Sequence, residues 1–189
     1  LGPRQTGKST LVRALHPDGY LPIGAFELLN RSLTIGARGP AASGWSWDLS
    51  TVVGGNRIDN RYENTNNPSL GATGPVSFYR GGTQFDQWTT NLALTGALPL
   101  GLATSLKVAF GAEHREDFYQ ILVGEPLSYS NGGVPVLDGP NVGRPAPVGV
   151  QPATGYRPSD ATSRHRHSQA AWLDLEQRLT PRLDLSAAA

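Results

Sequence analysis

Apolar and polar residues alternate along several segments of this chain, and this period of two residues constrains its fold more than any other feature. In the segment 45–54, Trp47, Leu49 and Val53 occupy one set of alternate positions, whereas Asp48 and Ser50 occupy the other. Successive side chains of a β-strand point to opposite faces, so the pattern predicts strands with one apolar and one polar face. A half-buried sheet in water gives the same alternation, so the pattern alone does not indicate a membrane.

The same period recurs along the chain and predicts an all-β fold of about six antiparallel strands that follow one another up and down. The expected strands span residues 31–38, 45–58, 84–95, 105–123, 167–179 and 183–189.

Short and long connections alternate between these strands. Residues 39–44, 99–101 and 180–182 contain the Gly and Pro residues that tight turns require. Residues 56–83 and 124–166 are long and polar or rich in Gly and Pro, and loops of that length are uncommon in compact soluble domains. Short periplasmic turns and long extracellular loops are typical of a transmembrane β-barrel, so we interpret the chain as a fragment of such a wall.

Composition excludes several kinds of site without identifying the class. The formal net charge is +1 and 16% of residues are charged, which gives no footprint for nucleic acid. The chain has no Cys, so thiolate metal sites, disulfides and cysteine nucleophiles are excluded. It also lacks the run of about 18 apolar residues that a transmembrane helix needs.

In a barrel, the alternation assigns a partner to each face. A charge on the lipid face near the middle of the membrane costs about 2–4 kcal/mol, so the apolar set is expected to contact lipid and the charged set to face the interior. Trp45, Trp88 and Tyr79 lie near strand ends, where either an aromatic girdle or ordinary strand packing explains them. The lipid set comprises Trp47, Leu49, Val53, Leu92, Leu94, Leu106, Val108, Phe110, Leu173 and Leu175, and the interior set comprises Asp48, Lys107, Glu113, Arg115, Asp174, Glu176 and Arg178.

The densest charge group could in principle hold a catalytic carboxylate pair. Because adjacent charges on a strand alternate between faces, we expect a solvated strand end instead. The group comprises Glu113, Arg115, Glu116 and Asp117.

His165 and His167 lie two residues apart, which on a strand places both imidazoles on one face, where they could hold a metal. Without a third ligand we predict no metal site, and we interpret residues 163–167 as a basic loop edge that attracts anionic substrate or lipopolysaccharide. Residues 128–133 and the Pro-rich run that follows either capture a ligand or act as passive cover. No Ser/His/Asp arrangement stands out, so we assign no catalytic residue and expect neither a cofactor nor an enzymatic activity.

Seven short motifs follow one another along most of the chain: 18–22 (DGYLP), 44–50 (GWSWDLS), 55–56 (GN), 63–71 (ENTNNPSLG), 110–115 (FGAEHR), 124–126 (GEP) and 174–176 (DLE). In these motifs and their order, residues 16–189 resemble the β-barrel domain of a TonB-dependent outer-membrane receptor. The resemblance implies residence in the bacterial outer membrane, uptake of a scarce nutrient such as a siderophore, cobalamin or a saccharide, and partners that include membrane lipid, a plug domain and the TonB complex. Such barrels have about 22 strands, so the chain resembles an interior slice of the wall.

Residues 1–15 carry a different motif, a match to the Walker A pattern with Gly2, Gly7, Lys8 and Ser9 at the fixed positions. The segment resembles the P-loop of a bacterial AAA-type ATPase, in which these residues bind phosphate and Mg²⁺. A P-loop follows a buried strand, but here only Leu1 precedes it, and Pro17 interrupts the expected helix. We therefore expect no working nucleotide site and interpret the junction near residue 16 as a chimeric reading frame.

Two other functions stay open on sequence grounds. One is a truncated P-loop ATPase that binds ATP through residues 2–9, and the other is a soluble β-sandwich or binding module. The absence of a secretory signal at residues 1–8 leads us to interpret the chain either as part of a longer precursor or as a chain with an altered start, because an outer-membrane protein is exported.

Overall fold

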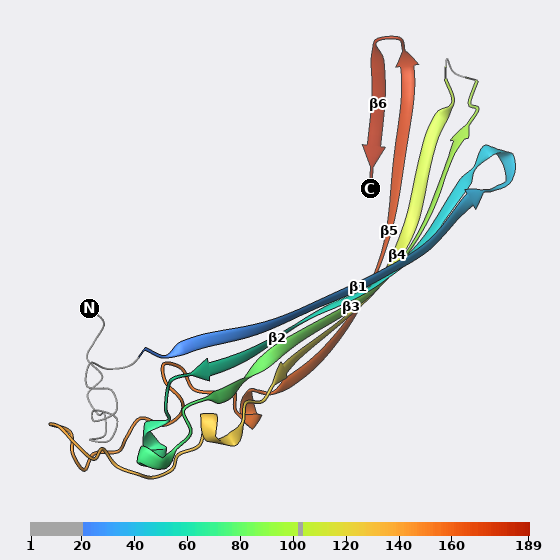
Figure 1. Cartoon of the computed structure of the whole chain (residues 1–189). Coiled ribbons are helices and arrows are strands. Elements are labelled where there is room, and N and C mark those ends of the chain that lie inside the picture. Colours follow the sequence, from blue (N-terminus) through green and yellow to red (C-terminus); the bar gives the residue numbers. More distant parts are fainter. Residues whose placement is uncertain (1–20, 102–103) are drawn as a thin grey trace. The chain divides into compact units, whose positions relative to one another are not determined.

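The computed structural model describes residues 21–101 and 104–189, whose regular structure is almost entirely β. Six antiparallel strands form one open sheet in which each strand pairs with its neighbour in the chain, in the order β1-β2-β3-β4-β5-β6 (Figure 1). This arrangement confirms the prediction of an all-β, up-and-down chain of six strands. The strands are β1 (Ile23–Pro40), β2 (Ser46–Glu63), β3 (Phe78–Leu98), β4 (Leu106–Leu122), β5 (Thr162–Thr180) and β6 (Leu183–Ala188).

The helical segments in the described residues are short 3₁₀ turns within the connections. They are η1 (Ala42–Gly44), η2 (Pro68–Thr73), η3 (Pro126–Ser128) and η4 (Pro158–Asp160). Three of them begin with proline, whose fixed φ suits the first helical position. Among residues 21–101 and 104–189, no helix is long and apolar enough to cross a lipid bilayer.

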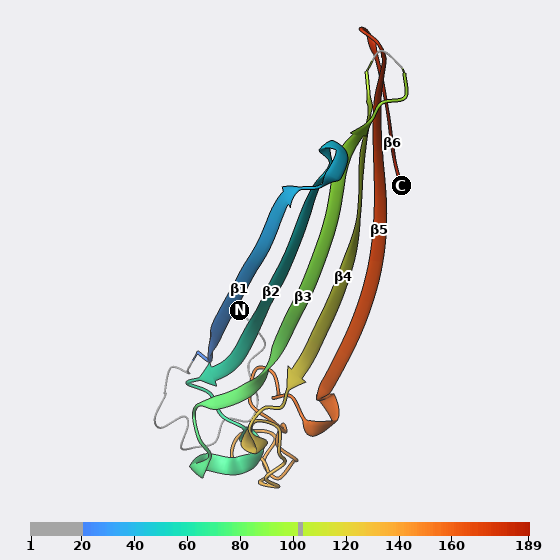
Figure 2. The ribbon, with the colours of Figure 1, turned by 90° about the vertical axis from the view of Figure 1, so that its right-hand side faces the viewer.

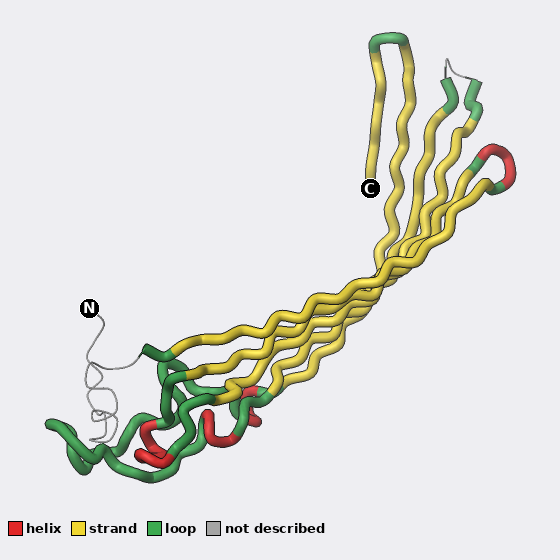
Figure 3. The backbone as a smooth tube through the Cα atoms, viewed as in Figure 1, coloured by secondary structure: helices red, strands yellow, loops and turns green. Residues whose placement is uncertain are grey.

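Several strands extend further than the alternation predicts. β2 continues to Glu63 and β3 begins at Phe78, so the predicted loop 56–83 shortens to residues 64–77 (Figure 3). β5 begins at Thr162, which ends the second long loop before residue 162, and β1 begins at Ile23. The prediction was wrong at these ends because the alternation is lost while the strands continue. Polar residues occupy both faces of the extensions of β2 and β5, whereas apolar residues such as Phe26, Leu28 and Leu29 occupy both faces of the extension of β1.

The chain divides into two compact units. Within the described residues, unit 1 comprises residues 21–29, 56–84 and 119–163, and unit 2 comprises residues 30–55, 85–101, 104–118 and 164–189. Unit 1 therefore contains both long loops, whereas the turns after β1, β3 and β5 belong to unit 2.

The short turns of unit 2 lie where Gly and Pro predicted them. Between β1 and β2, the Ala41 N–H donates to the Trp45 carbonyl at 2.7 Å and the Trp45 N–H donates to the Ala42 carbonyl at 3.2 Å. Ser43 and Gly44 have φ values of 60° and 78°, and glycine adopts this left-handed conformation without steric cost.

The turn after β5 leads into the shortest strand. The pairing of β5 with β6 runs from Asp174↔Ala188 to Thr180↔Leu183, with an irregularity between Arg178 and Thr180. β6 therefore covers only the last part of β5. Figure 2 shows β1 to β5 following one another in chain order.

Aromatic rings of unit 2 pack over glycines in neighbouring strands. Trp45 meets Phe110 edge to face, with ring centroids 5.9 Å apart, and the Trp45 indole lies so close to Gly96 that a Cβ there would collide with it. The Trp172 ring lies over Gly111 in the same way, at 2.8 Å from the position of an added Cβ. These glycines provide the space that the rings occupy.

We predict that Gly96→Val destabilises unit 2 by about 1–3 kcal/mol, because the added side chain displaces Trp45 from its contact with Phe110. Urea unfolding in detergent, followed by tryptophan fluorescence, measures this change. The matched control is Ala97→Val, at an exposed position next in the strand. Equal midpoints for the two variants would contradict the packing described.

Candidate functional site

One face of unit 2 presents large apolar side chains to its surroundings. Val53 of β2 is 51% exposed, Leu92 of β3 is 42% exposed and Phe110 of β4 is 41% exposed. These residues belong to the set that the alternation assigned to lipid. Val108 of the same set is different, because it is only 8% exposed and is packed into the sheet surface.

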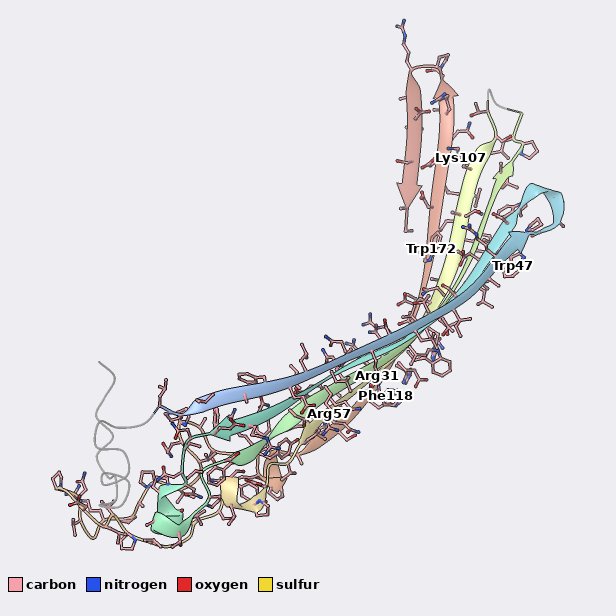
Figure 4. All side chains as sticks on the ribbon, in the orientation of Figure 1. Arg31, Trp47, Arg57, Lys107, Phe118 and Trp172 are labelled. Atoms are coloured by element: carbon pink, nitrogen blue, oxygen red, sulfur yellow. The ribbon has the colours of Figure 1, made fainter. Side chains whose placement is uncertain are left out.

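The opposite face of unit 2 carries charges in cross-strand ion pairs. Lys107 Nζ lies 3.1 Å from Glu176 Oε2, and Arg178 Nε lies 2.8 Å from Asp184 Oδ1. A groove of about 480 Å³ is lined by these four side chains, and Figure 4 marks Lys107 on β4. Lys107, Glu176 and Arg178 belong to the predicted interior set, and the structure brings them together.

Asp117 is the centre of a second polar cluster in unit 2, although we predicted a solvated strand end there. It is 6% exposed, and its carboxylate accepts hydrogen bonds from Gln87 Nε2 at 2.8 Å and Arg166 Nη2 at 2.6 Å. Arg115 Nε lies 3.5 Å from the same carboxylate. The prediction was wrong because it considered only β4, whereas Gln87 and Arg166 come from β3 and β5.

Glu116 contacts two histidines, His114 and His165. Our interpretation of His165 as part of a loop edge was wrong, because this residue lies in strand β5. The two carboxylate oxygens of Glu116 lie 3.2 Å from His114 Nε2 and 3.0 Å from His165 Nε2. The His165 ring stacks on Phe118, with centroids 4.4 Å apart and planes at 4°, while its centroid is 6.4 Å from that of His167. Within the described residues, no three His, Cys, Asp or Glu side chains form a group that could hold a metal ion.

In unit 1, Arg57, Asp59 and Tyr79 form a closed network between β2 and β3. Arg57 Nε donates to Asp59 Oδ2 at 2.6 Å, and the Tyr79 hydroxyl donates to Asp59 Oδ1 at 2.6 Å. The Arg57 guanidinium, with help from the Tyr79 hydroxyl, holds the pKa of Asp59 below its ordinary value. Burial and the Asp59 carboxylate raise the pKa of Tyr79, so its phenol stays protonated and continues to donate.

The two long loops of unit 1 fold onto one another around Asn67. This side chain is fully buried and makes five hydrogen bonds. Its amide group donates to the carbonyls of Leu127 and Ser130, at 2.9 and 2.8 Å. Its oxygen accepts from Ser69 N, Ser69 Oγ and Gly149 N. One amide therefore joins loop 64–77 to two separate parts of the longer loop.

Other buried polar groups extend this connection. The Thr65 hydroxyl donates to the Gln151 carbonyl at 2.6 Å, and the buried Ser128 carbonyl accepts from the N–H groups of Val150 and Gly155. We call residues 64–77 and 123–161 together the loop body. Neither of the two sequence interpretations of residues 128–133, ligand capture or passive cover, anticipated that Ser128 would anchor this body, because its partners lie far away in sequence.

Gly2, Gly7, Lys8 and Ser9, the phosphate-binding candidates of the alternative interpretation, lie outside the residues that the structure describes. No protein-family model, curated protein or solved structure matches this chain.

We predict that Asn67→Ala loosens the loop body, because it leaves the Leu127 carbonyl and the buried Gly149 N–H without their partner and removes one of the two hydrogen bonds to the Ser130 carbonyl. Each such group costs about 1–3 kcal/mol. Hydrogen exchange at the Gly149 amide measures the change and is expected to accelerate by about tenfold or more.

Asn131→Ala, which changes an exposed loop residue, is the control and is expected to leave the exchange of Gly149 unchanged. Equal exchange rates in the two variants would show that Asn67 does not hold the loops together.

We also predict that Asp59 makes unit 1 more stable above a pH of about 4 than below it. Its folded-state pKa lies below the unfolded value of about 3.9, so its contribution is present above that value and is lost as the pH falls through the folded-state pKa. Measuring the stability of unit 1 by hydrogen exchange as the pH is lowered tests this. In Asp59→Asn, this stability is expected to depend less steeply on pH in the acid range, which we call the acid limb. Glu63→Gln, which removes an exposed carboxylate from the same strand, serves as the control. A limb of unchanged slope in Asp59→Asn would contradict the assignment.

Proposed function

We propose that this chain is a fragment of the barrel wall of a TonB-dependent outer-membrane receptor that takes up a scarce nutrient. The observation that carries the proposal is the up-and-down sheet whose unit 2 exposes apolar side chains such as Leu92 and Phe110 on one face, while the pairs Lys107–Glu176 and Arg178–Asp184 lie on the other. In water, exposing Val53, Leu92 and Phe110 is unfavourable, whereas in a bilayer the same side chains are in their preferred environment.

Strand length supports this assignment. Crossing the hydrocarbon core takes about 9–11 tilted residues. Residues 46–55 of β2, 85–98 of β3 and 106–118 of β4 lie in unit 2, so these strands are long enough. Unit 2 is then the proposed membrane-spanning part, and the long loops are proposed to be extracellular, as in the barrels that the chain resembles.

We propose that further strands complete the sheet in the working protein. Among the described residues, β1 pairs with β2 alone. β6 pairs with β5 as far as Asp174, and one more bonded pair joins Leu173 to Ala189. Unpaired backbone groups are costly in lipid, so the proposed wall closes by pairing these edges with other strands. The pairs Lys107–Glu176 and Arg178–Asp184 then face the interior, where a plug domain and water are the proposed neighbours.

We predict that Leu92→Arg impairs membrane insertion, because the guanidinium on the lipid face costs about 2–4 kcal/mol near the bilayer midplane. The measurement is the fraction of chain inserted into lipid vesicles, from quenching of tryptophan fluorescence by brominated lipid. The matched control is Asn91→Arg, one residue away on the opposite face, which is expected to insert like the unmodified chain.

Equal insertion of the two variants would argue against a lipid-facing apolar surface. A chain that folds and stays monomeric in water without detergent would instead favour the soluble β-sandwich.

A further inference from the structure

Arg80 of β3 and two tyrosines form a cluster within unit 1, which we call the Arg80 clamp. The Arg80 guanidinium carbon lies 5.3 Å from the ring centroid of Tyr62 on β2 and 5.4 Å from that of Tyr156 in the longer loop. Both distances are within the range of cation–π attraction. All three side chains are half-buried, so the guanidinium is held in place while part of it stays accessible.

Backbone contacts position each member of the clamp. Arg80 Nε donates to the Thr154 carbonyl at 2.9 Å, and the Tyr156 N–H donates to the Arg80 carbonyl at 2.9 Å. Gly81 has a φ of 106°, and a Cβ there would stand 2.8 Å from the Tyr156 ring. The absence of a side chain at position 81 thus lets Tyr156 pack directly against the strand beside Arg80.

The charge of Arg80 is not neutralised within the part of the chain that the structure describes, where no carboxylate forms an ion pair with it. Arg57, on the neighbouring strand β2, shows the contrast: its guanidinium is bonded at both Nε and Nη2 to the Asp59 carboxylate. Unit 1 therefore contains one arginine that stabilises the fold through a carboxylate and one arginine that is oriented but has no anionic partner.

We infer that the Arg80 clamp binds a carboxylate group of a small-molecule ligand. The bond to Thr154 occupies Nε and leaves the terminal Nη groups, whose planar geometry matches a carboxylate with two parallel hydrogen bonds. A single guanidinium matches the charge of one carboxylate, and the flanking tyrosines provide ring faces and hydroxyls for the remainder of the ligand. Carboxylate binding itself does not depend on the proposed function. Only its role, ligand capture on the extracellular side, rests on that proposal.

The test uses the full chain folded in detergent and titrated with benzoate, with the amide NMR signals of Gly155 and Tyr156 as the readout. Neutral benzamide, which has nearly the same shape, and inorganic phosphate are titrated in parallel. We expect saturable shifts with benzoate, and an affinity lower by about tenfold or more in Arg80→Gln. Arg80→Lys keeps the charge but lacks the planar fork and is expected to weaken binding as well.

Arg57→Gln is the matched control, because it removes an arginine from the adjacent strand and is expected to retain benzoate affinity. The NMR spectrum of each variant reports whether it folds. If Arg80→Gln does not fold, the benzoate affinity of Arg80→Lys tests the inference instead. The inference is overturned if benzamide or phosphate binds as well as benzoate, if the Arg80 variants retain affinity, or if the unmodified chain gives no saturable shift. None of these readouts depends on membrane insertion, so they separate failure of the clamp from failure of the proposed receptor.

Discussion

The opposite orientation of successive side chains along a β-strand is the constraint on which the architecture of unit 2 depends. It places Leu92 and Phe110 on one surface and Lys107, Glu176 and Arg178 on the other. A shift of one residue in the pairing of any strand would bring charges onto the apolar face. The cross-strand contacts of Asp117 and Glu116, which lie on opposite faces of β4, help to hold the pairing with β5 in register.

Unit 1 is held together differently, by buried polar groups instead of an apolar face. Closing two long loops costs conformational entropy, and the loop body buries few large apolar side chains, among them Val136 and Val150. Hydrogen bonds to the side chain of Asn67 and the backbone of Ser128 offset part of this cost. A loop body ordered in this way keeps Tyr156 beside Arg80, and a fixed arrangement reduces the entropy that a ligand would lose on binding.

The strand order and the positions of the short turns could be predicted from the sequence, because apolar alternation and the Gly and Pro residues are local signals. The polar ends of β2 and β3 could not, since residues such as Asp59 and Tyr79 carry no apolar pattern and are ordered by contacts to each other. The environment of Asp117 was missed for a related reason: Arg166 lies 49 positions away. For the Arg80 clamp, the sequence contains no spacing rule that brings Tyr62 and Tyr156 together.

A spin-label accessibility scan along residues 87–95 of β3, in a chain incorporated into lipid vesicles, tests the central claim most directly. Each position is labelled in turn, and collisions with oxygen, which partitions into lipid, are compared with collisions with a water-soluble nickel complex. The account predicts a period of two residues, with Trp88, Thr90, Leu92 and Leu94 accessible from lipid and Gln87, Thr89, Asn91 and Ala93 shielded from it. Equal access of the nickel complex to both sets, or the absence of a two-residue period, would contradict it.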